Sequence, residues 1–158
     1  MTDLFFWSTN VNSITYKSLL IAFALVWLLL AGCTKQIKPR HLAGTWVGTD
    51  RCLNSLGPVE TRKTWVFEVS ENGDITGTTR WQLMDGKGGH DGDKLVDAHA
   101  EDVIGAFDPR TGDFYLVEME ENGIIHGRFI NKDEISVFLV QSGKKPVVSH
   151  IELNRKID

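Results

Sequence analysis

Hydrophobic and polar residues alternate along most of the chain after Leu42. In the segment TWVFEV, Trp65, Phe67 and Val69 fall on one side of an extended backbone and the intervening residues on the other. The segments GIIHGRFI and VVSHIELNR repeat this alternation. A two-residue period is typical of β-strands that have one face in a core and the other in solvent. The pattern therefore predicts a domain built from half-buried strands.

Eight segments carry this alternation or a more apolar version of it. In GDFYLVEME, the set Tyr115, Val117 and Met119 is expected to face the core, whereas EISVFLVQ is apolar on both faces. The segments between them, such as SENGD, DPRTGD and EENG, are short and rich in turn-forming residues. The expected strands are 42–49, 64–70, 74–83, 95–107, 112–120, 123–131, 134–141 and 147–155.

Strands joined in order by short turns form an antiparallel meander. A meander of this length closes most simply into a barrel, because closure removes exposed strand edges. The predicted fold class is therefore all-β, an antiparallel eight-stranded meander barrel. A barrel of this size is either filled by side chains or holds one small ligand. The aromatic candidates for lining such a ligand, most of them expected to be core, are Trp65, Phe67, Trp81, Tyr115 and Phe129.

Two segments lack a strand pattern. The segment DRCLNSLGPVETRK, residues 50–63, is long for a barrel turn and is expected to be a loop or a lid, with Cys52 a small buried side chain within it. The segment MDGKGGHDGDK, residues 84–94, is expected to be a hairpin tip. Oxygen-rich loops can bind calcium, but the EF-hand spacing is missing, and no metal site is predicted. Its acidic and imidazole side chains are Asp85, His90, Asp91 and Asp93.

An uncharged apolar run of 15 residues, from Ser18 to Gly32, precedes the domain. A membrane-spanning helix needs about 20 residues, whereas the apolar region of a signal peptide has about 7–15. Lys17 stands directly before the run, as in the basic start of a signal peptide. The run therefore favours a cleaved signal peptide, with an uncleaved membrane anchor as the alternative.

The end of the run, Leu30-Ala31-Gly32-Cys33, resembles the lipobox of bacterial lipoproteins. The resemblance implies cleavage between Gly32 and Cys33 and lipidation of Cys33 by a diacylglycerol and an N-acyl chain such as palmitate. Two or more acyl chains anchor a protein stably to a membrane. An ordinary secreted protein is the third alternative. The expected organisation is a signal peptide over 1–32, a lipidated N-terminus and tether over 33–41, and a barrel domain over 42–158.

The residue after the cysteine bears on the location. In lipoproteins of Gram-negative bacteria an Asp at this position tends to retain the protein in the inner membrane, and here the residue is Thr34. The resemblance therefore implies the bacterial cell envelope, with the outer membrane favoured and the domain on its periplasmic face.

The net charge and the remaining motifs limit the classes of partner and cofactor that the sequence predicts. A formal net charge of −4 argues against nucleic acid, whose binders usually carry a basic patch. Lipidation of Cys33 would leave Cys52 without an intramolecular partner, so no disulfide framework is expected. The sequence has no CxxC pair and no Gly-rich phosphate loop, and no cofactor is predicted.

The start and the end of the domain resemble the calycins, the group of lipocalins and avidins. The segment LAGTWVG is similar to their Gly-x-Trp first strand, with Gly44 and Trp46 at the matching positions. The resemblance implies that Arg155, in the last strand, stacks on Trp46 and closes one end of the barrel. A guanidinium over an indole contributes about 0.5–2 kcal/mol.

The segments TWVFEVSENGDITGTT and EISVFLVQSG are similar to strands of the avidin branch. The biotin ligands of that branch do not carry over, because Thr79 stands where its third strand has a Tyr. The resemblance therefore concerns the fold and does not predict biotin binding.

The sequence predicts no enzyme and no catalytic residue. Neither G-x-S-x-G nor H-E-x-x-H occurs, and no nucleophile has the neighbouring base that catalysis requires. His99 and Glu101 share one face of a strand, as His126 and Arg128 do, and all four are expected to be exposed polar residues.

Two functions remain as expectations. One is a non-enzymatic barrel for a small apolar or amphipathic ligand, which requires an interior cavity of roughly 300 Å³ or more. The alternative is a protein-interaction module, either an envelope assembly factor or an inhibitor of a lytic enzyme, with its contacts on the 50–63 segment or an exposed strand face.

Overall fold

The computed structural model describes residues 36–91 and 94–157. The expected signal peptide, its cleavage site and Cys33 lie outside these residues. Ten strands and one short 3-10 helix make up the described part of the chain. They are η1 (Pro39–His41), β1 (Gly44–Asn54), β2 (Gly57–Val69), β3 (Asp74–Asp85), β4 (Gly89–Asp91), β5 (Lys94–Val96), β6 (Ala98–Phe107), β7 (Asp113–Glu118), β8 (Gly123–Asn131), β9 (Glu134–Gln141) and β10 (Val147–Arg155).

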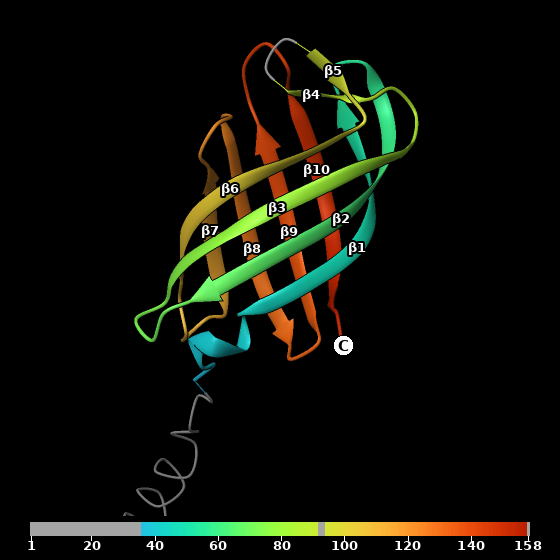
Figure 1. The fold of residues 1–158 in the computed structure, drawn as a ribbon. Helices are drawn as coiled ribbons and strands as arrows, with labels where there is room; N and C mark the ends of the chain where they lie inside the picture. The colour runs from blue at the N-terminus through green and yellow to red at the C-terminus, as the bar shows by residue number, and fades with distance from the viewer. Residues whose placement is uncertain (1–35, 92–93, 158) are drawn as a thin grey trace, which may run out of the picture. The chain divides into compact units, whose positions relative to one another are not determined.

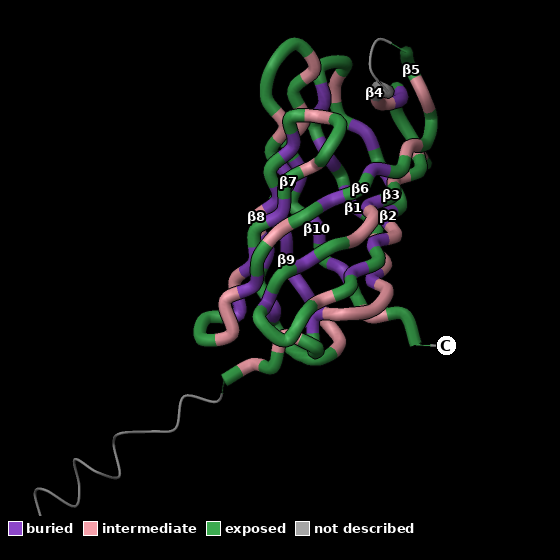
Figure 2. The backbone as a smooth tube through the Cα atoms, turned by 60° about the vertical axis from the view of Figure 1, so that its left-hand side comes forward, coloured by how far each residue is buried: buried purple, intermediate pink, exposed green. Residues whose placement is uncertain are grey.

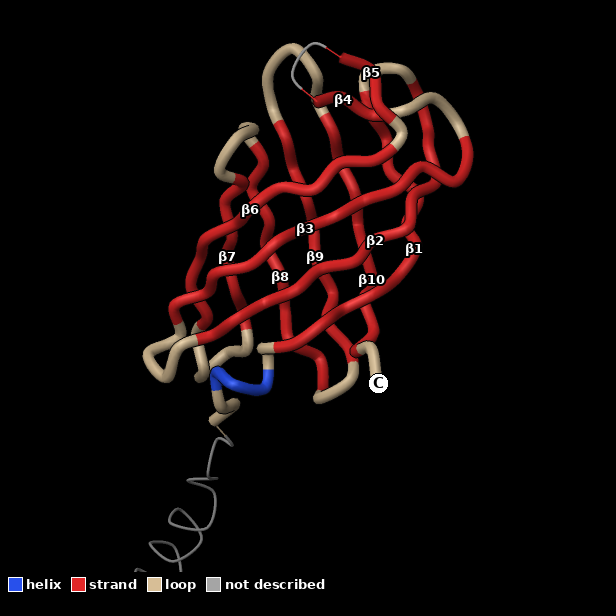
Figure 3. The backbone as a smooth tube through the Cα atoms, viewed as in Figure 1, coloured by secondary structure: helices blue, strands red, loops and turns tan. Residues whose placement is uncertain are grey.

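Eight of the strands close into an antiparallel barrel in the order β1-β10-β9-β8-β7-β6-β3-β2 (Figure 1). The predicted eight-stranded meander barrel is therefore confirmed. The barrel closes where Trp46 of β1 lies opposite Arg155 of β10. Strands β4 and β5 form a separate two-stranded hairpin between β3 and β6 (Figure 3).

The expectation of a long loop over residues 50–63 is wrong. β1 runs on to Asn54 and β2 starts at Gly57, so the two strands form one long hairpin with a tight turn. Gly57 has a φ of +124°, which only glycine adopts readily. Inward-facing polar residues hid the strands, because polar positions on both faces remove the alternation that identifies a strand.

The predicted orientation of the seventh strand is also wrong. Phe114 and Leu116 of β7 are buried inside the barrel, whereas Tyr115, Val117 and Met119 are exposed on its outside. Both sets are apolar, and periodicity alone does not say which of two apolar faces is inside. The sequence predicts that the set Tyr115, Val117 and Met119 faces the core, and the structure places it in solvent.

The barrel has a closed end and an open end. At the closed end η1 lies across the barrel, and the indole Nε1 of Trp46 donates a hydrogen bond of 2.9 Å to the carbonyl of Leu42. The half of the barrel next to it is filled with large apolar side chains that come from all eight barrel strands. Figure 2 shows buried positions along these strands. They include Trp46, Trp65, Phe67, Ile75, Phe107, Phe114, Leu116, Ile125, Phe129, Ile135, Ile151 and Leu153.

The inward-facing residues change character toward the open end, where β4 and β5 lie. There the interior positions of the strands are occupied mainly by polar and charged side chains. Those that are buried are Asp50, Asn54, Thr61, Lys63, Thr79, Glu101 and Ser149. The interior of the barrel therefore has an apolar half, which forms the hydrophobic core, and a polar half, which is not needed for the packing of that core.

Candidate functional site

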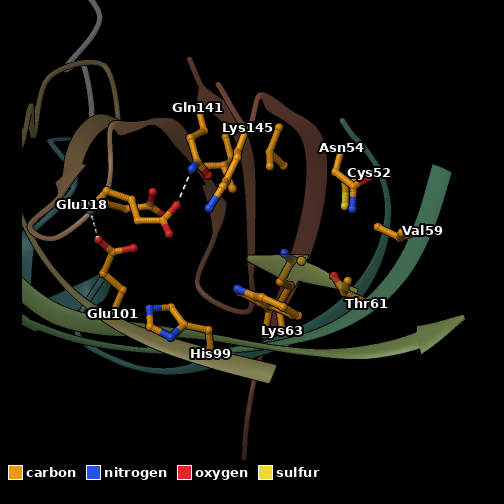
Figure 4. A pocket seen from close by; sticks show the side chains of 15 residues that line it. Cys52, Asn54, Val59, Thr61, Lys63, His99, Glu101, Glu118, Gln141 and Lys145 are labelled. Carbon is orange, nitrogen blue, oxygen red and sulfur yellow. Dashed lines mark hydrogen bonds between the residues drawn. The ribbon is translucent and has the colours of Figure 1, made fainter. Parts of the chain in front are cut away.

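A pocket of about 60 Å³ lies inside the open end of the barrel (Figure 4). Figure 4 shows Glu101 and Glu118 on one side of it, Cys52 and Thr61 on the other, and Lys63 between them. Seven of the eight barrel strands, all except β8, supply lining residues, and β4 adds Gly89. The lining residues are Cys52, Asn54, Val59, Thr61, Lys63, Trp81, Gly89, His99, Glu101, Glu118, Glu121, Leu139, Gln141, Lys145 and Val147.

A buried carboxylate organises the inner part of this half. The hydroxyl groups of Thr61 and Ser149 donate hydrogen bonds to the two carboxylate oxygens of Asp50, one to each. The Nζ atom of Lys63 lies 3.8 Å from Asp50 Oδ1, and both side chains are almost fully buried. Three strands, β1, β2 and β10, therefore hold one charge in place.

The ammonium group of Lys63 is less well satisfied than the carboxylate beside it. An N–H···O hydrogen bond spans about 2.7–3.2 Å, so the 3.8 Å contact with Asp50 is an ion pair without a hydrogen bond. Within residues 36–91 and 94–157, no acceptor is placed at hydrogen-bond distance from this ammonium. A buried ammonium group that lines a pocket and keeps its donors available can bind an acceptor there.

Three glutamates form the opposite wall. Glu101 Oε1 accepts hydrogen bonds from the backbone N–H groups of Glu120 and Glu121, at 2.7 and 2.6 Å. Glu121 Oε2 accepts one from the side-chain amide of Gln141. Burial raises the pKa of Glu118 to about 7, and the nearby charges of Glu101 and Glu121 act in the same direction. Burial also raises the pKa of Glu101.

Residues of the rim attach the β4 hairpin to the barrel. The side-chain amide of Asn54 donates hydrogen bonds to the carbonyl groups of Lys87 and Gly88, at 3.3 and 3.4 Å. Gly89 lies against the ring of Trp81, and a Cβ atom at this glycine would come within 2.6 Å of the ring. The rim of the pocket is thus built by contacts specific to these side chains.

Cys52 lies on the opposite side of the pocket from the glutamates, and it is buried as expected. Burial raises the pKa of its thiol, which leaves less thiolate at neutral pH. It is free among the described residues.

The aromatic residues expected to line a ligand site separate into three groups. Trp81 lines the pocket. Trp65, Phe67 and Phe129 belong to the packed core of the closed end. Tyr115 is 57% exposed on the outer face, stacked on the ring of His126, so its assignment to the interior is wrong.

The two residues expected to close the barrel lie together at the closed end. The guanidinium carbon of Arg155 is 4.2 Å from the centre of the Trp46 ring. Arg155 also donates hydrogen bonds to the backbone carbonyl groups of His41, Ala43 and Lys132. One side chain therefore ties η1, the start of β1 and the β8–β9 turn to the last strand.

Sequence reasoning missed most of the pocket. The sequence predicts a loop at Thr61 and Lys63, which line the pocket, and at Asp50, which contacts both of them. It also predicts that Glu101 is exposed, whereas this residue is 6% exposed. A signal was present in the last strand, where Ser149 shares the inward phase of Val147 and Ile151. A polar residue at an inward position is the feature that indicates a site in such a barrel.

An apolar row crosses the outside of the barrel from β1 to β6. Its six residues are exposed and pair directly across successive strands: Leu53, Val148, Val140, Ile124, Val117 and Ile104. Beside it run two stacked ring pairs, Tyr115 with His126 and Phe138 with His150. We call these ten residues the outer apolar belt.

The described residues contain no group of three or more side chains arranged to hold a metal ion. Of the helical segments described, none is long and apolar enough to cross a membrane. The side chains of His90 and Asp91 and the whole of Asp93, which the 84–94 segment offered as oxygen and nitrogen ligands, lie outside the described part. What the pocket offers chemically is a set of charges and hydrogen-bonding groups in a partly enclosed space.

Comparison with known proteins supports the barrel fold and assigns neither a family nor a function. No family model and no curated protein matches the chain. The structure of EF1p2_mFAP2b bound to DFHBI is similar, with a TM-score of 0.53 and 13% identity over 79% of this chain and 100% of that one. A fluorescence-activating β-barrel designed de novo gives a TM-score of 0.44 and 18% identity over 75% of this chain and 96% of the other.

Proposed function

We propose that this protein is a lipid-anchored lipoprotein of the bacterial cell envelope whose barrel binds a small amphipathic ligand through the pocket at its open end. The observation that supports ligand binding is the division of the interior into a packed apolar half and a polar half with buried charges. We take the binding to be non-enzymatic, as the sequence predicts because neither G-x-S-x-G nor H-E-x-x-H occurs in it.

The cost of the polar half supports a functional reason for it. Burying an ion pair costs desolvation that its attraction often fails to repay, and well-packed apolar side chains in its place are commonly as stable or more stable. Asp50 and Lys63 occupy such positions, with side chains 0% and 5% exposed. The eight strands would close equally well over an apolar interior, so the polar residues are best explained by what they bind.

The size of the pocket limits the ligand. The small apolar or amphipathic ligand expected from the sequence requires an interior cavity of roughly 300 Å³ or more, and the pocket of about 60 Å³ does not provide it. Large side chains fill the closed end, where an apolar ligand would have to lie. We propose instead an amphipathic ligand whose polar end alone is enclosed, with the rest projecting through the mouth of the pocket.

The anchor rests on the resemblance of Leu30-Ala31-Gly32-Cys33 to a lipobox. Only Thr34 and Lys35 separate Cys33 from Gln36, the first described residue, and the chain enters the barrel domain at its closed end. A lipid on Cys33 would therefore hold the closed end near the membrane and leave the pocket free to face the periplasm. Thr34 favours the outer membrane.

The anchor is tested by replacing Cys33 with Ser and separating the membranes. We expect the wild-type protein in the membrane fraction as a lipid-modified chain starting at Cys33, identified by mass spectrometry of its N-terminal peptide. The Cys33→Ser protein should lose that modification. A mature-size Cys33→Ser product that still partitions with membranes would contradict lipid anchoring.

Ligand binding is tested by thermal shift with a library of small polar and amphipathic molecules. Val147 lines the pocket, and Val147→Trp should fill it. We expect at least one compound to raise the Tm of the wild type and not that of Val147→Trp, with Val148→Trp, on the outer face of the same strand, as the matched control. Compounds that stabilise all three proteins equally, or none at all, would count against a binding function for the pocket.

A second candidate function is a protein-interaction module of the envelope, and the outer apolar belt favours it. Contiguous exposed apolar surface of this kind marks sites of protein association. A photo-crosslinking residue at Ile124, within the belt, should give one defined adduct with an envelope protein in cells. The same residue at Glu152, outside the belt on β10, should not. Adducts from both positions, or from neither, would remove the support for this candidate.

A further inference from the structure

We infer that the ligand of the open-end pocket carries both a carboxylate and a protonated amine, as an amino acid does, with the carboxylate bound by Lys63 and the amine by Glu118. This inference rests on the proposed binding function and names the chemical class of its ligand. It follows from two groups of opposite charge whose hydrogen-bonding capacity the described residues leave unused.

The donors of Lys63 require an acceptor inside the pocket. Asp50 Oδ1 lies 3.8 Å from the Nζ atom of Lys63, and the carboxylate oxygens of Asp50 already accept hydrogen bonds from Thr61 and Ser149. A buried polar group without a hydrogen bond is costly, and more so when it is charged. A ligand carboxylate would supply the missing acceptor atoms to a side chain that is 5% exposed and cannot turn out to solvent.

The acceptors on the opposite wall require a donor. Glu118 faces the pocket, and within the described residues its carboxyl group has neighbouring charges but no hydrogen-bond donor. Glu101 uses one oxygen for two backbone N–H groups, and Glu121 is held by Gln141. These bonds fix the two flanking carboxylates, so that Glu118 is the acceptor of the wall to which no described residue donates a hydrogen bond; its Oε2 lies against Gly123. A protonated amine is the donor that such a wall favours, and the ring of Trp81 in the same lining suits a cation as well.

A ligand with a single charge fits less well. An anion would meet three glutamates on the wall facing Lys63, and a simple amine would leave the ammonium of Lys63 without an acceptor. A molecule with both groups satisfies both walls at once. The volume of about 60 Å³ is that of roughly two water molecules, so the pocket encloses the charged groups of a small molecule and little more.

The experiment compares amino acids with compounds that carry only one of the two groups. The probes are glycine, 3-aminopropanoate, 4-aminobutanoate and 6-aminohexanoate, together with propylamine and propanoate. Binding to the wild-type protein is measured by calorimetry at pH 8, where Glu118 is ionised. We expect one chain length to bind at least about tenfold more tightly than either compound with one group, because each charged hydrogen bond contributes at least that factor.

Two substitutions assign the walls. Lys63→Met should remove the advantage of the best amino acid over propylamine, and Glu118→Gln should remove its advantage over propanoate. The matched controls are Lys144→Met and Glu120→Gln, at exposed positions near the pocket that do not line it. Because Lys63→Met leaves Asp50 buried without its partner, the double variant Asp50→Asn/Lys63→Met serves as a second test if the single variant is unstable.

The outcomes separate the ligand class from the binding function. If propylamine or propanoate binds as tightly as every amino acid, or if the two wall variants weaken all probes alike, the inference is overturned. The binding function still stands in that case, provided that Val147→Trp abolishes binding of the same probes. If no probe binds the wild type, the inference is also overturned, and the library screen with Val147→Trp decides the binding function separately.

Discussion

Replacing Asp50 with Ala should destabilise the barrel more than any single substitution of a polar residue that lines the pocket. The side chain of Asp50 is 0% exposed and is contacted by Thr61, Ser149 and Lys63. Its removal leaves a buried ammonium without a countercharge and two hydroxyl groups without an acceptor. Breaking a buried ion pair in this way costs about 3–5 kcal/mol.

The size of the effect distinguishes the buried pair from a surface one. An exposed ion pair contributes about 0–1 kcal/mol. The Lys132–Asp133 pair, 3.5 Å apart with the lysine side chain 86% exposed, provides the comparison within the same protein. Asp133→Ala should therefore change the free energy of unfolding by less than about 1 kcal/mol.

Equilibrium unfolding in urea, followed by the fluorescence of the buried tryptophans Trp46 and Trp65, measures both changes. The double variant Asp50→Leu/Lys63→Met should recover most of the lost stability, because it removes both charges together. Two results would refute this reasoning about the buried ion pair. One is a loss of unfolding free energy below about 1 kcal/mol in Asp50→Ala. The other is a double variant that is less stable than Asp50→Ala.

Three further predictions concern other parts of the barrel. The raised pKa of Glu118, about 7 against an ordinary 4.5, means that the folded state binds the proton more tightly. The contribution of Glu118 to the free energy of unfolding should therefore be greatest below pH 4.5 and fall by up to about 3 kcal/mol as the pH rises to 7. Urea unfolding at several pH values should show this dependence for Glu120→Gln and not for Glu118→Gln. Arg155→Ala should lower the free energy of unfolding by about 2–4 kcal/mol, because the cation–π contact and the hydrogen bonds of Arg155 are lost. Arg155→Lys should restore less than half of that loss, and a full restoration would contradict the role given to these contacts. In a Cys33→Ser background, Cys52 should react with a thiol reagent at least about tenfold faster in urea than in the native state, since burial both shields the thiol and raises its pKa; equal rates would show that the thiol is accessible.

The strands and their order follow from local pattern. Alternation around Trp65 and Phe67, around Ile125, and around Ile151 and Leu153 was sufficient to identify strands and their inward faces. Short turns between them then required antiparallel neighbours, and closure followed because eight strands otherwise leave exposed edges. These features depend on neighbouring residues in the chain and are therefore visible in the sequence.

The candidate site was not visible in this way. Asp50, Thr61 and Lys63 interrupt the apolar pattern of β1 and β2, so the strands that carry them looked like a loop. In β7 the alternation was clear, but it did not show which face of the strand is inside, because Phe114 and Leu116 alternate with residues that are also apolar.

The sequence by itself determined an eight-stranded meander and the residues that share a face in most of its strands. Only the tertiary structure decided which face of β7 is inside, which end of the barrel is filled, and that Lys63 of β2 faces the same pocket as Glu118 of β7. The physical reason is that periodicity records the relation of each residue to its neighbours two positions away. A pocket is made by residues far apart in the chain, which closure of the barrel brings together.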